Sequence, residues 1–395
     1  MKSAAPAGLH PTRFLRLHWH KKPLLLRQAF PGFAGLLSPR ELMRLACRDD
    51  VQARLVLGRG KRRELRQGPF RASDFRALPA RGWTLLVQEV NHFLPAAEHL
   101  LRAFSFVPHA RLDDVMVSYA PDGGGVGPHF DSYDVFLLQG PGRRRWRISA
   151  QDDRELVPDS PLRILRRFRP ELEWVLEPGD MLYLPPRYAH DGIALGACMT
   201  CSIGFRAPSH QELVTGFLEH LAEGIHLPGM YQDPDLRPQR EPARIGAPML
   251  SKAEAIVSRL RWRRRDILRF LGCRLTEPKP HVFFTPPRPP MSAARFAAYC
   301  RRHGVRLDPR SRLLYAGGLF FVNGDSLEGT VRRAASLLRR LANDRELPPC
   351  DPGAEARALL YRWYRHGYIV CQWKSPRPST PASKASPSTV PRSAP

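Results

Sequence analysis

The feature that most constrains this fold is a series of short apolar runs, separated by turns, between about residues 112 and 205. Two Pro-Gly pairs, Pro141-Gly142 and Pro178-Gly179, are typical of tight turns, because proline fixes φ and glycine supplies the positive φ of the next position. Short strands at regular spacing favour a barrel or jelly roll over a parallel sheet. We expect a mouth in this roll where side chains from different strands converge. The predicted strands cover residues 115–120, 131–139, 144–149, 172–176, 181–184, 191–195 and 198–205.

A glycine-rich turn, residues 123–127, leads into one of the predicted strands. The segment that follows this turn carries His129, Asp131 and Tyr133. Residues i and i+2 of an extended chain share a face, so these side chains are expected to point the same way. An imidazole and a carboxylate can hold one metal ion, and a second histidine would complete the facial triad of a non-haem Fe(II) oxygenase. A surface loop in which histidine and aspartate alternate by chance is the simpler alternative.

The third ligand is predicted to be His190, which lies 59 residues after Asp131 (190 − 131 = 59). It follows the proline-stiffened segment 185–189, directly after a predicted strand. A core histidine with satisfied hydrogen bonds is the other interpretation of this residue. The competing ligands, none of which follows a strand and a rigid turn, are His92, His99 and His109.

Alternation along residues 142–148 puts Arg144, Trp146 and Ile148 on one face of a strand. An arginine pointing inward beside two apolar residues needs an anion there, and a guanidinium suits a carboxylate because it can bind both oxygens. The opposite face is expected to be solvated and carries Arg143, Arg145 and Arg147.

A strand from Leu112 to Tyr119 is predicted to place Asp114, Met116 and Ser118 on one face. A carboxylate, a thioether and a hydroxyl on one wall could bind a basic, partly aliphatic side chain.

The composition bounds the size and the partners of the chain. With 395 residues it is long enough for two or three domains. The net charge of +25, mostly from arginine, favours polyanions such as ribosomal RNA, although an arginine-rich codon composition explains it equally well.

The seven cysteines are odd in number and scattered, which indicates free thiols in a reducing compartment. Cys198 and Cys201 have C-x-x-C spacing but lie on a predicted strand, where they would face opposite sides. No apolar run resembles a signal peptide or approaches the length of a membrane span. We therefore expect a cytoplasmic protein that does not associate with membranes.

Residues before about 112 are interpreted as a support for the strand-rich centre. Ser38-Pro39 is typical of a helix start, with Ser38 as N-cap and Glu41 three residues later. Strands are predicted at 55–57 and 83–90, separated by a basic, turn-rich segment, residues 58–68.

Five long motifs in the centre resemble those of the bacterial ribosomal oxygenases. These are JmjC-type, cupin-fold enzymes that depend on 2-oxoglutarate and Fe(II). The resemblance implies an α+β protein with a double-stranded β-helix, or jelly roll, as its core. The motifs lie at residues 112–118, 123–136, 142–147, 176–186 and 202–208.

The resemblance also implies a role for each candidate residue. His129, Asp131 and His190 would hold Fe(II), while Arg144 would bind the distal carboxylate of 2-oxoglutarate, with Ser118 as a further co-substrate contact. The residues implied to form the pocket for a substrate arginine are Asp114, Met116, Tyr133 and Ser202.

The implied reaction uses O2 and 2-oxoglutarate to hydroxylate carbon 3 of an arginine in a large-subunit ribosomal protein. Two other functions stay open. One is a non-catalytic, winged-helix nucleic-acid-binding protein on a cupin scaffold. The other is a histidine-directed hydroxylase or a demethylating relative.

Beyond residue 208, helix starts are predicted at Ser209 and Ser251, each a serine with glutamate three residues later. By resemblance, these helices form a homodimerisation segment. Later signals resemble a winged helix: a helix between Ser292 and Gly304, strands at 313–315 and 319–322, an Asn323-Gly324 hairpin turn, helices at 330–342 and 355–365, and a strand at 368–373. The predicted domains are a catalytic domain at 1–208, a helical dimerisation segment at 209–274, a winged-helix-like domain at 275–374 and a disordered tail at 375–395.

Overall fold

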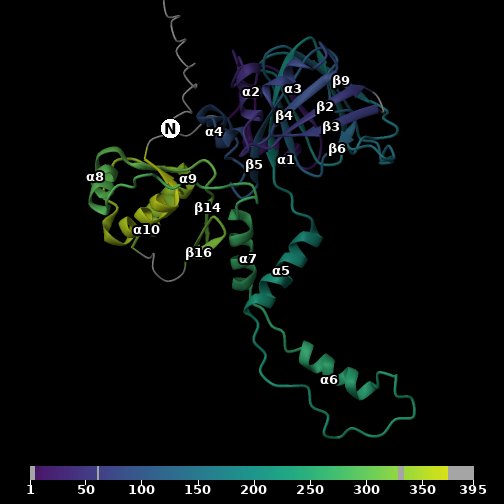
Figure 1. The fold of residues 1–395 in the computed structure, drawn as a ribbon, viewed down its shortest axis with the longest axis vertical. Helices are drawn as coiled ribbons and strands as arrows, with labels where there is room; N and C mark the ends of the chain where they lie inside the picture. The colour runs from purple at the N-terminus through teal and green to yellow at the C-terminus, as the bar shows by residue number, and fades with distance from the viewer. Residues whose placement is uncertain (1–4, 60–61, 328–332, 372–395) are drawn as a thin grey trace, which may run out of the picture.

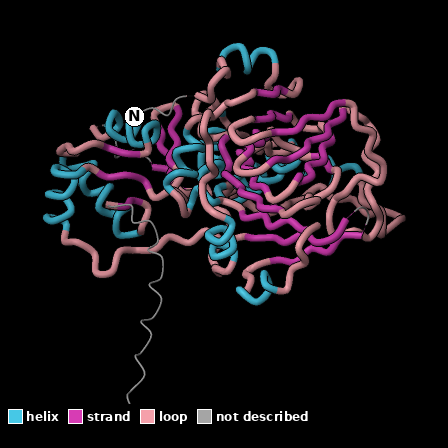
Figure 2. The backbone as a smooth tube through the Cα atoms, turned by 90° about the horizontal axis from the view of Figure 1, so that it is seen from above, coloured by secondary structure: helices cyan, strands magenta, loops and turns pink. Residues whose placement is uncertain are grey.

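The computed structural model describes residues 5–59, 62–327 and 333–371. A β-sandwich and a smaller mixed domain lie side by side, and a helical arm projects away from both (Figure 1). Figure 2 shows the strands of the sandwich stacked in layers beside the smaller domain. The predicted disordered tail lies outside the described residues, and the domain boundaries stay a prediction.

The sandwich consists of two antiparallel sheets, as predicted for a jelly roll. The larger sheet has the order β1-β10-β7-β12-β5-β4-β2-β3, and the smaller has the order β6-β11-β8-β9. The strands of the larger sheet are β1 (Leu24–Leu26), β10 (Met181–Leu184), β7 (Val135–Gln139), β12 (Cys198–Phe205), β5 (Leu112–Ala120), β4 (Trp83–Val87), β2 (Ala53–Arg59) and β3 (Arg62–Gln67). Those of the smaller sheet are β6 (His129–Phe130), β11 (Ala189–Leu195), β8 (Arg143–Ser149) and β9 (Leu172–Leu176).

Two apolar cores hold the sandwich together. The larger one lies between the outer face of the large sheet and the N-terminal helices, and includes Phe14, Leu42, Phe104 and Phe136. The helices of this layer are α1 (Pro11–Leu17), α2 (Pro39–Ala46), α3 (Ala72–Arg76) and α4 (Pro95–Arg102), with a 3₁₀ turn, η1 (Val90–His92). The smaller core lies between the sheets and joins β7 and β10 to β8 and β9. Three residues of this core, Val135, Leu137 and Trp146, also line a cavity between the sheets.

Three expectations about the strands are wrong. The strand predicted at 83–90 ends at Val87, and Val90 begins the 3₁₀ turn η1. The strand predicted at 131–139 begins only at Val135, because residues 131–134 carry the chain from the smaller sheet to the larger one. The predicted turn-rich segment at 58–68 contains β3, which pairs with β2 along its length. Alternating charges in β3 conceal the strand in the sequence, since an edge strand needs few apolar residues.

The helical arm consists of α5 (His210–Gly224) and α6 (Ala247–Val257), and the next helix, α7 (Arg264–Thr276), packs against the hairpin of the smaller domain. Ser209 caps α5 with the predicted capping box, and Ser38 does the same for α2. The second predicted start is wrong: α6 begins at Ala247, so Ser251 lies inside the helix. Pro248 in the first turn of α6 has a fixed helical φ and explains the earlier start.

The smaller domain has the predicted order of helices and hairpin around its own core, which includes Phe296, Leu338 and Trp363. Ser292 caps the first helix, and Asn323-Gly324 forms the turn between two paired strands. Its elements are α8 (Ala293–His303), β13 (Val305–Leu307), β14 (Leu313–Ala316), β15 (Leu319–Val322), β16 (Asp325–Leu327), α9 (Ala335–Asp344), β17 (Glu346–Leu347), α10 (Gly353–His366) and β18 (Ile369–Val370).

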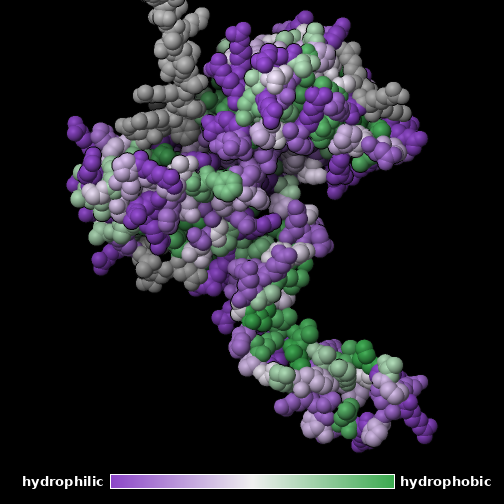
Figure 3. Space-filling model, viewed as in Figure 1, coloured by the Kyte–Doolittle hydropathy of each residue, from purple (hydrophilic) through white to green (hydrophobic). Residues whose placement is uncertain are grey.

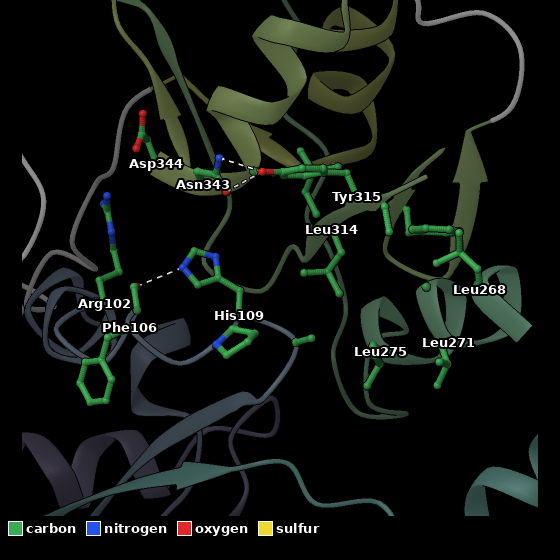
Figure 4. A pocket seen from close by; sticks show the side chains of 18 of the residues that line it. Arg102, Phe106, His109, Leu268, Leu271, Leu275, Leu314, Tyr315, Asn343 and Asp344 are labelled. Atoms are coloured by element: carbon green, nitrogen blue, oxygen red, sulfur yellow. Dashed lines mark hydrogen bonds between the residues drawn. The ribbon is translucent and has the colours of Figure 1, made fainter. Parts of the chain in front are cut away.

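Buried ion pairs join the smaller domain to the sandwich. Glu98 of α4 accepts hydrogen bonds from Arg306 at 2.8 Å and from Arg345 at 2.9 Å. Beside them lies a cavity of about 770 Å³, which we call the junction cavity (Figure 4). Leucines of α7 and β14 form one of its sides, and His109 lies on the other.

Candidate active site

Three potential metal ligands meet at the edge of the smaller sheet. His129 and His190 are directly opposite each other on β6 and β11, with ring centroids 4.2 Å apart. Asp131 follows β6, and its carboxylate oxygens lie 3.9 Å from His129 Nε2 and 3.5 Å from His190 Nε2. Within the described residues, this is the one group of three such side chains whose ligand atoms lie within 4.8 Å of one another.

Backbone carbonyls fix the orientation of both imidazoles. His129 Nδ1 lies 2.8 Å from the carbonyl oxygen of Gly127, and His190 Nδ1 lies 3.1 Å from that of Tyr188. When each Nδ1–H donates to its carbonyl, the Nε2 lone pairs face the centre of the group, as metal ligation requires. Burial, assisted by the neighbouring His129, lowers the pKa of His190 to about 4, so this ring is neutral at pH 7.

Glycines bring the chain into this geometry. Gly127 has φ +99°, a left-handed conformation that favours glycine, and its carbonyl is the one that His129 contacts. A Cβ on Gly125 would collide with the backbone of Gly192 in β11. The glycine-rich turn can therefore pass close to the strand that carries His190.

The triad lies in a cavity of about 550 Å³ between the two sheets, which we call the sandwich cavity. The structure brings all nine candidate residues together along its walls. From the smaller sheet and its turn come His129, Asp131, Tyr133, Arg144 and His190, and from the larger sheet come Asp114, Met116, Ser118 and Ser202.

Arg144 is a buried cation that lacks a matching anion among the described residues. Its side chain lines the sandwich cavity, the residue is 4% exposed, and its Nε and Nη2 atoms have no hydrogen-bond partner in the part of the chain that the structure describes. The guanidinium carbon lies 5.8 Å from the ring centroid of Trp146, as the alternation along β8 predicts. Burying unpaired donors is costly, so this site fits an anionic ligand such as a carboxylate.

The opposite face of β8 is less solvated than expected. Arg143 is exposed, but Arg147 donates a hydrogen bond to Asp191 on the neighbouring strand at 2.7 Å. The two residues are register partners, so the cross-strand pair withdraws Arg147 from solvent.

Asp114 supplies negative charge at the other end of the cavity. Its Oδ2 atom accepts a hydrogen bond from the backbone N–H of Glu89 at 3.0 Å. Burial and the adjacent Asp113 raise the pKa of Asp114 to about 6. Gly204 faces this carboxylate, and a Cβ there would lie 3.2 Å from Oδ1.

Tyr133 lies at the mouth of the cavity. Its side chain is 41% exposed, and the Asp131 charge together with burial raises the pKa of its hydroxyl. The residue is not on a strand with Asp131, so the predicted shared face is not the reason that both line the cavity.

Thr200 and Arg54 are among the lining residues that were not predicted from the sequence. Thr200 is buried directly opposite Ser118, whose hydroxyl lies 3.5 Å from the Thr200 carbonyl oxygen. Alternation from Ser202 along β12 could have identified it. Arg54 comes from β2, and its Nε is buried without a partner. No local motif signals Arg54, because only the sheet order brings β2 to the cavity.

The three other histidines considered as metal ligands lie away from the triad. His92 lies 3.6 Å from Glu89, and His109 contacts the Ser105 hydroxyl at the junction cavity. His99 belongs to α4 and does not line the sandwich cavity.

Comparisons with known proteins agree with this geometry. The JmjC domain family matches residues 99–213, and the ROXA-like winged helix family matches residues 259–369. The ribosomal protein uL16 3-hydroxylase of Escherichia coli is 34% identical over 327 residues, which cover 82% of this chain and 87% of that protein. A probable ribosomal oxygenase of Haemophilus influenzae is 40% identical over 235 residues, which cover 58% of this chain and 56% of that protein.

Solved structures give the same result for the whole fold. An X-ray structure of E. coli YcfD has a TM-score of 0.81 at 33% identity and covers 92% of this chain and 98% of its own. A structure of the ribosomal oxygenase YcfD in complex with cobalt and 2-oxoglutarate has a TM-score of 0.78 at 32% identity, covering 93% and 99%. This chain therefore belongs to the family of JmjC-domain ribosomal oxygenases.

Proposed function

We propose that this protein hydroxylates carbon 3 of an arginine in ribosomal protein uL16, the substrate named for its E. coli relative. When bound, Fe(II) activates O2 so that one oxygen atom enters the C–H bond and the other converts 2-oxoglutarate to succinate and carbon dioxide. A ribosomal substrate also implies a cytoplasmic enzyme. Among the described residues, no helix is both long and apolar enough to cross a bilayer.

Different side chains of the sandwich cavity would bind the metal and the co-substrate. His129, Asp131 and His190 would hold the metal, since two imidazoles and one carboxylate leave open positions for co-substrate and oxygen. Arg144 would bind the distal carboxylate of 2-oxoglutarate through its unpaired Nε and Nη2, with Ser118 beside it.

Substrate recognition would belong to the opposite wall of the cavity. Asp114 would pair with the substrate guanidinium, while Met116 and Tyr133 flank its methylene groups and Ser202 contributes a hydroxyl. Such positioning holds one carbon near the metal and excludes water from the reacting atoms.

One observation carries the proposal: a metal triad and a buried, unpaired guanidinium share a single cavity. A scaffold that only binds nucleic acid has no need of this costly arrangement. Asp114 further favours arginine over histidine as the target, because a carboxylate matches a guanidinium.

The test incubates recombinant uL16 with the protein, Fe(II), ascorbate and 2-oxoglutarate, followed by intact-mass and fragment analysis. We expect a gain of one oxygen on a single arginine, together with succinate release. Oxygen on a histidine would favour the histidine-directed alternative. No oxygen gain and no succinate above background would refute the enzyme proposal.

We also propose that two copies pair through the helical arm. Figure 3 shows apolar side chains gathered on the arm, where Met230 is 86% exposed and Ile245 is 75% exposed. A contiguous apolar surface of this kind fits a second copy of the same chain. Light scattering should give the mass of a dimer, and Leu218→Lys on α5 should yield monomers. A monomeric parent protein would contradict this.

Contact with ribosomal RNA is proposed at a groove between α7 and the winged helix. Three exposed arginines, Arg264, Arg265 and Arg339, line it without an acidic residue. Replacing all three with glutamine should weaken RNA binding and reduce its salt dependence. Equal weakening by a glutamine triple variant at Arg301, Arg302 and Arg365 would indicate nonspecific attraction.

A further inference from the structure

The segment between α7 and α8 reaches across to the substrate end of the sandwich cavity. Its Lys279 lies 2.9 Å from Glu89 Oε1 and 3.3 Å from the carboxylate of Asp113. His281 from the same segment contacts Glu89 Oε2 at 2.6 Å. A cation outside the sandwich thus connects two acids of the catalytic domain.

Both acids contact or adjoin Asp114. Glu89 donates its backbone N–H to Asp114 Oδ2, and its own φ is +53°, a conformation uncommon for a residue with a side chain. Asp113 precedes Asp114 on β5. The position and the charge of the Asp114 carboxylate therefore depend on groups that Lys279 holds.

Other charges surround this cluster without replacing Lys279. Arg312 donates to the backbone carbonyls of Leu112 and Asp113 at 3.0 Å, and Arg206 lies 3.1 Å from Asp113. His92 faces Glu89 but is neutral at pH 7, because burial lowers its pKa to about 4.

Tyr133 also faces Asp114 from the mouth, as an uncharged phenol. In the described part of the chain, Lys279 is the one cation within salt-bridge distance of both Glu89 and Asp113.

The electrostatics agree with this geometry. Burial opposes ionisation of Asp113, but Lys279, Arg312 and Arg206 lower its pKa. Burial and Asp113 raise the pKa of Asp114, and Lys279 acts against that rise. Removing the Lys279 charge should therefore raise the pKa of Asp114 further above about 6, towards neutral pH.

We infer that Lys279 is a positioning residue, supplied from outside the sandwich, that keeps Asp114 an anion aimed at the substrate guanidinium. This role rests on the proposed function of Asp114 as the arginine partner. It makes arginine recognition depend on the docking of the C-terminal part of the chain, although that part does not line the substrate pocket.

The test measures binding rather than turnover. Fluorescence anisotropy from pH 5 to 9 would use an unmodified uL16 peptide that contains the arginine identified in the turnover assay. The comparison is the same peptide carrying citrulline, an uncharged isostere, in place of that arginine. Wild-type affinity for the arginine peptide should be full above the pKa of Asp114 and fall below it. The citrulline peptide should show no such transition.

Lys279→Met should move that transition to higher pH. If the pKa of Asp114 rises by about one unit, the arginine peptide binds up to about tenfold more weakly to the variant than to the wild type at pH values below this pKa. The affinity for the arginine peptide returns to the wild-type value at pH 9. Lys279→Arg keeps the charge and should keep the wild-type profile. Arg274→Met is the matched control, since Arg274 is exposed and contacts Glu277 outside the cluster.

Two outcomes would overturn the inference. An unchanged transition in Lys279→Met would mean that Lys279 does not act on Asp114. Equal weakening of both peptides at every pH would mean that it is merely structural. A wild-type protein that hydroxylates no arginine peptide fails at the earlier turnover assay, so the failure of the proposed function is recognised separately.

Discussion

The junction cavity and the sandwich cavity of this protein are opposite in chemistry. The junction cavity is about 770 Å³ and the sandwich cavity about 550 Å³. Polar groups at the junction cavity satisfy one another: His109 contacts Ser105, and Tyr315 contacts Asn343 (Figure 4). In the sandwich cavity, donors of Arg144 and Arg54 are buried without partners. Unmet polar groups therefore identify the binding site better than volume does.

We expect that the sandwich cavity needs a ligand and that substitutions at the junction cavity leave ligand binding unchanged. Buried polar groups without partners lower stability unless a ligand satisfies them, so the sandwich cavity is maintained for binding. The polar contacts at the junction cavity are satisfied, so we interpret this cavity as a packing defect between two domains.

The largest effect is expected at the metal triad. His190→Ala removes one of the three proposed ligands. Because loss of even a group that only hydrogen-bonds to a ligand costs about 10–100-fold in metal affinity, we expect a loss of at least about 100-fold. Calorimetry with Co(II) would measure the affinity, and succinate release would measure turnover. His109→Ala at the junction cavity is the control and should retain both. Unchanged Co(II) affinity in His190→Ala would exclude this residue as a ligand.

Arg144→Gln should produce the next largest effect. Losing a buried charged partner costs about 2 kcal/mol or more, which corresponds to at least about 30-fold weaker 2-oxoglutarate binding. Arg143→Gln is a matched control on the same strand, because that side chain is exposed. If both variants bind 2-oxoglutarate like the parent protein, the anion lies elsewhere in the cavity.

Sequence patterns predict the residues that line the site better than the parts of the chain that position them. The strands at 172–176, 181–184 and 198–205 are confirmed to the residue, because period-two patterns and Pro-Gly turns are local signals. All nine candidate residues line one cavity, yet Asp131 leaves its predicted strand to cross between the sheets. Nothing local could reveal Lys279 beside Glu89, since 190 residues (279 − 89) separate them along the chain.

A smaller effect is expected at the domain junction. Glu98→Gln removes the charge that holds Arg306 and Arg345, and a hydrogen bond to a charged group contributes about 1.5 kcal/mol or somewhat more. The decrease in the free energy of unfolding should lie at the low end of this range, because Arg345 keeps three backbone carbonyl acceptors. Denaturant unfolding would measure it, with Glu64→Gln at an exposed pair as a control expected to show no change. Equal stability of the two variants would mean that the junction does not depend on Glu98.

The smallest effect is expected from filling the junction cavity. Ala316 on β14 is exposed at the edge of this cavity and lines it together with Leu268 and Leu271, so Ala316→Leu adds apolar contacts to the apolar wall. We expect a stability gain of about 0.5–1 kcal/mol in denaturant unfolding, as is usual for cavity filling, and unchanged affinity for 2-oxoglutarate and the arginine peptide. Weaker binding of either ligand would show that the junction cavity takes part in function, because a packing defect can be filled without cost to a separate site.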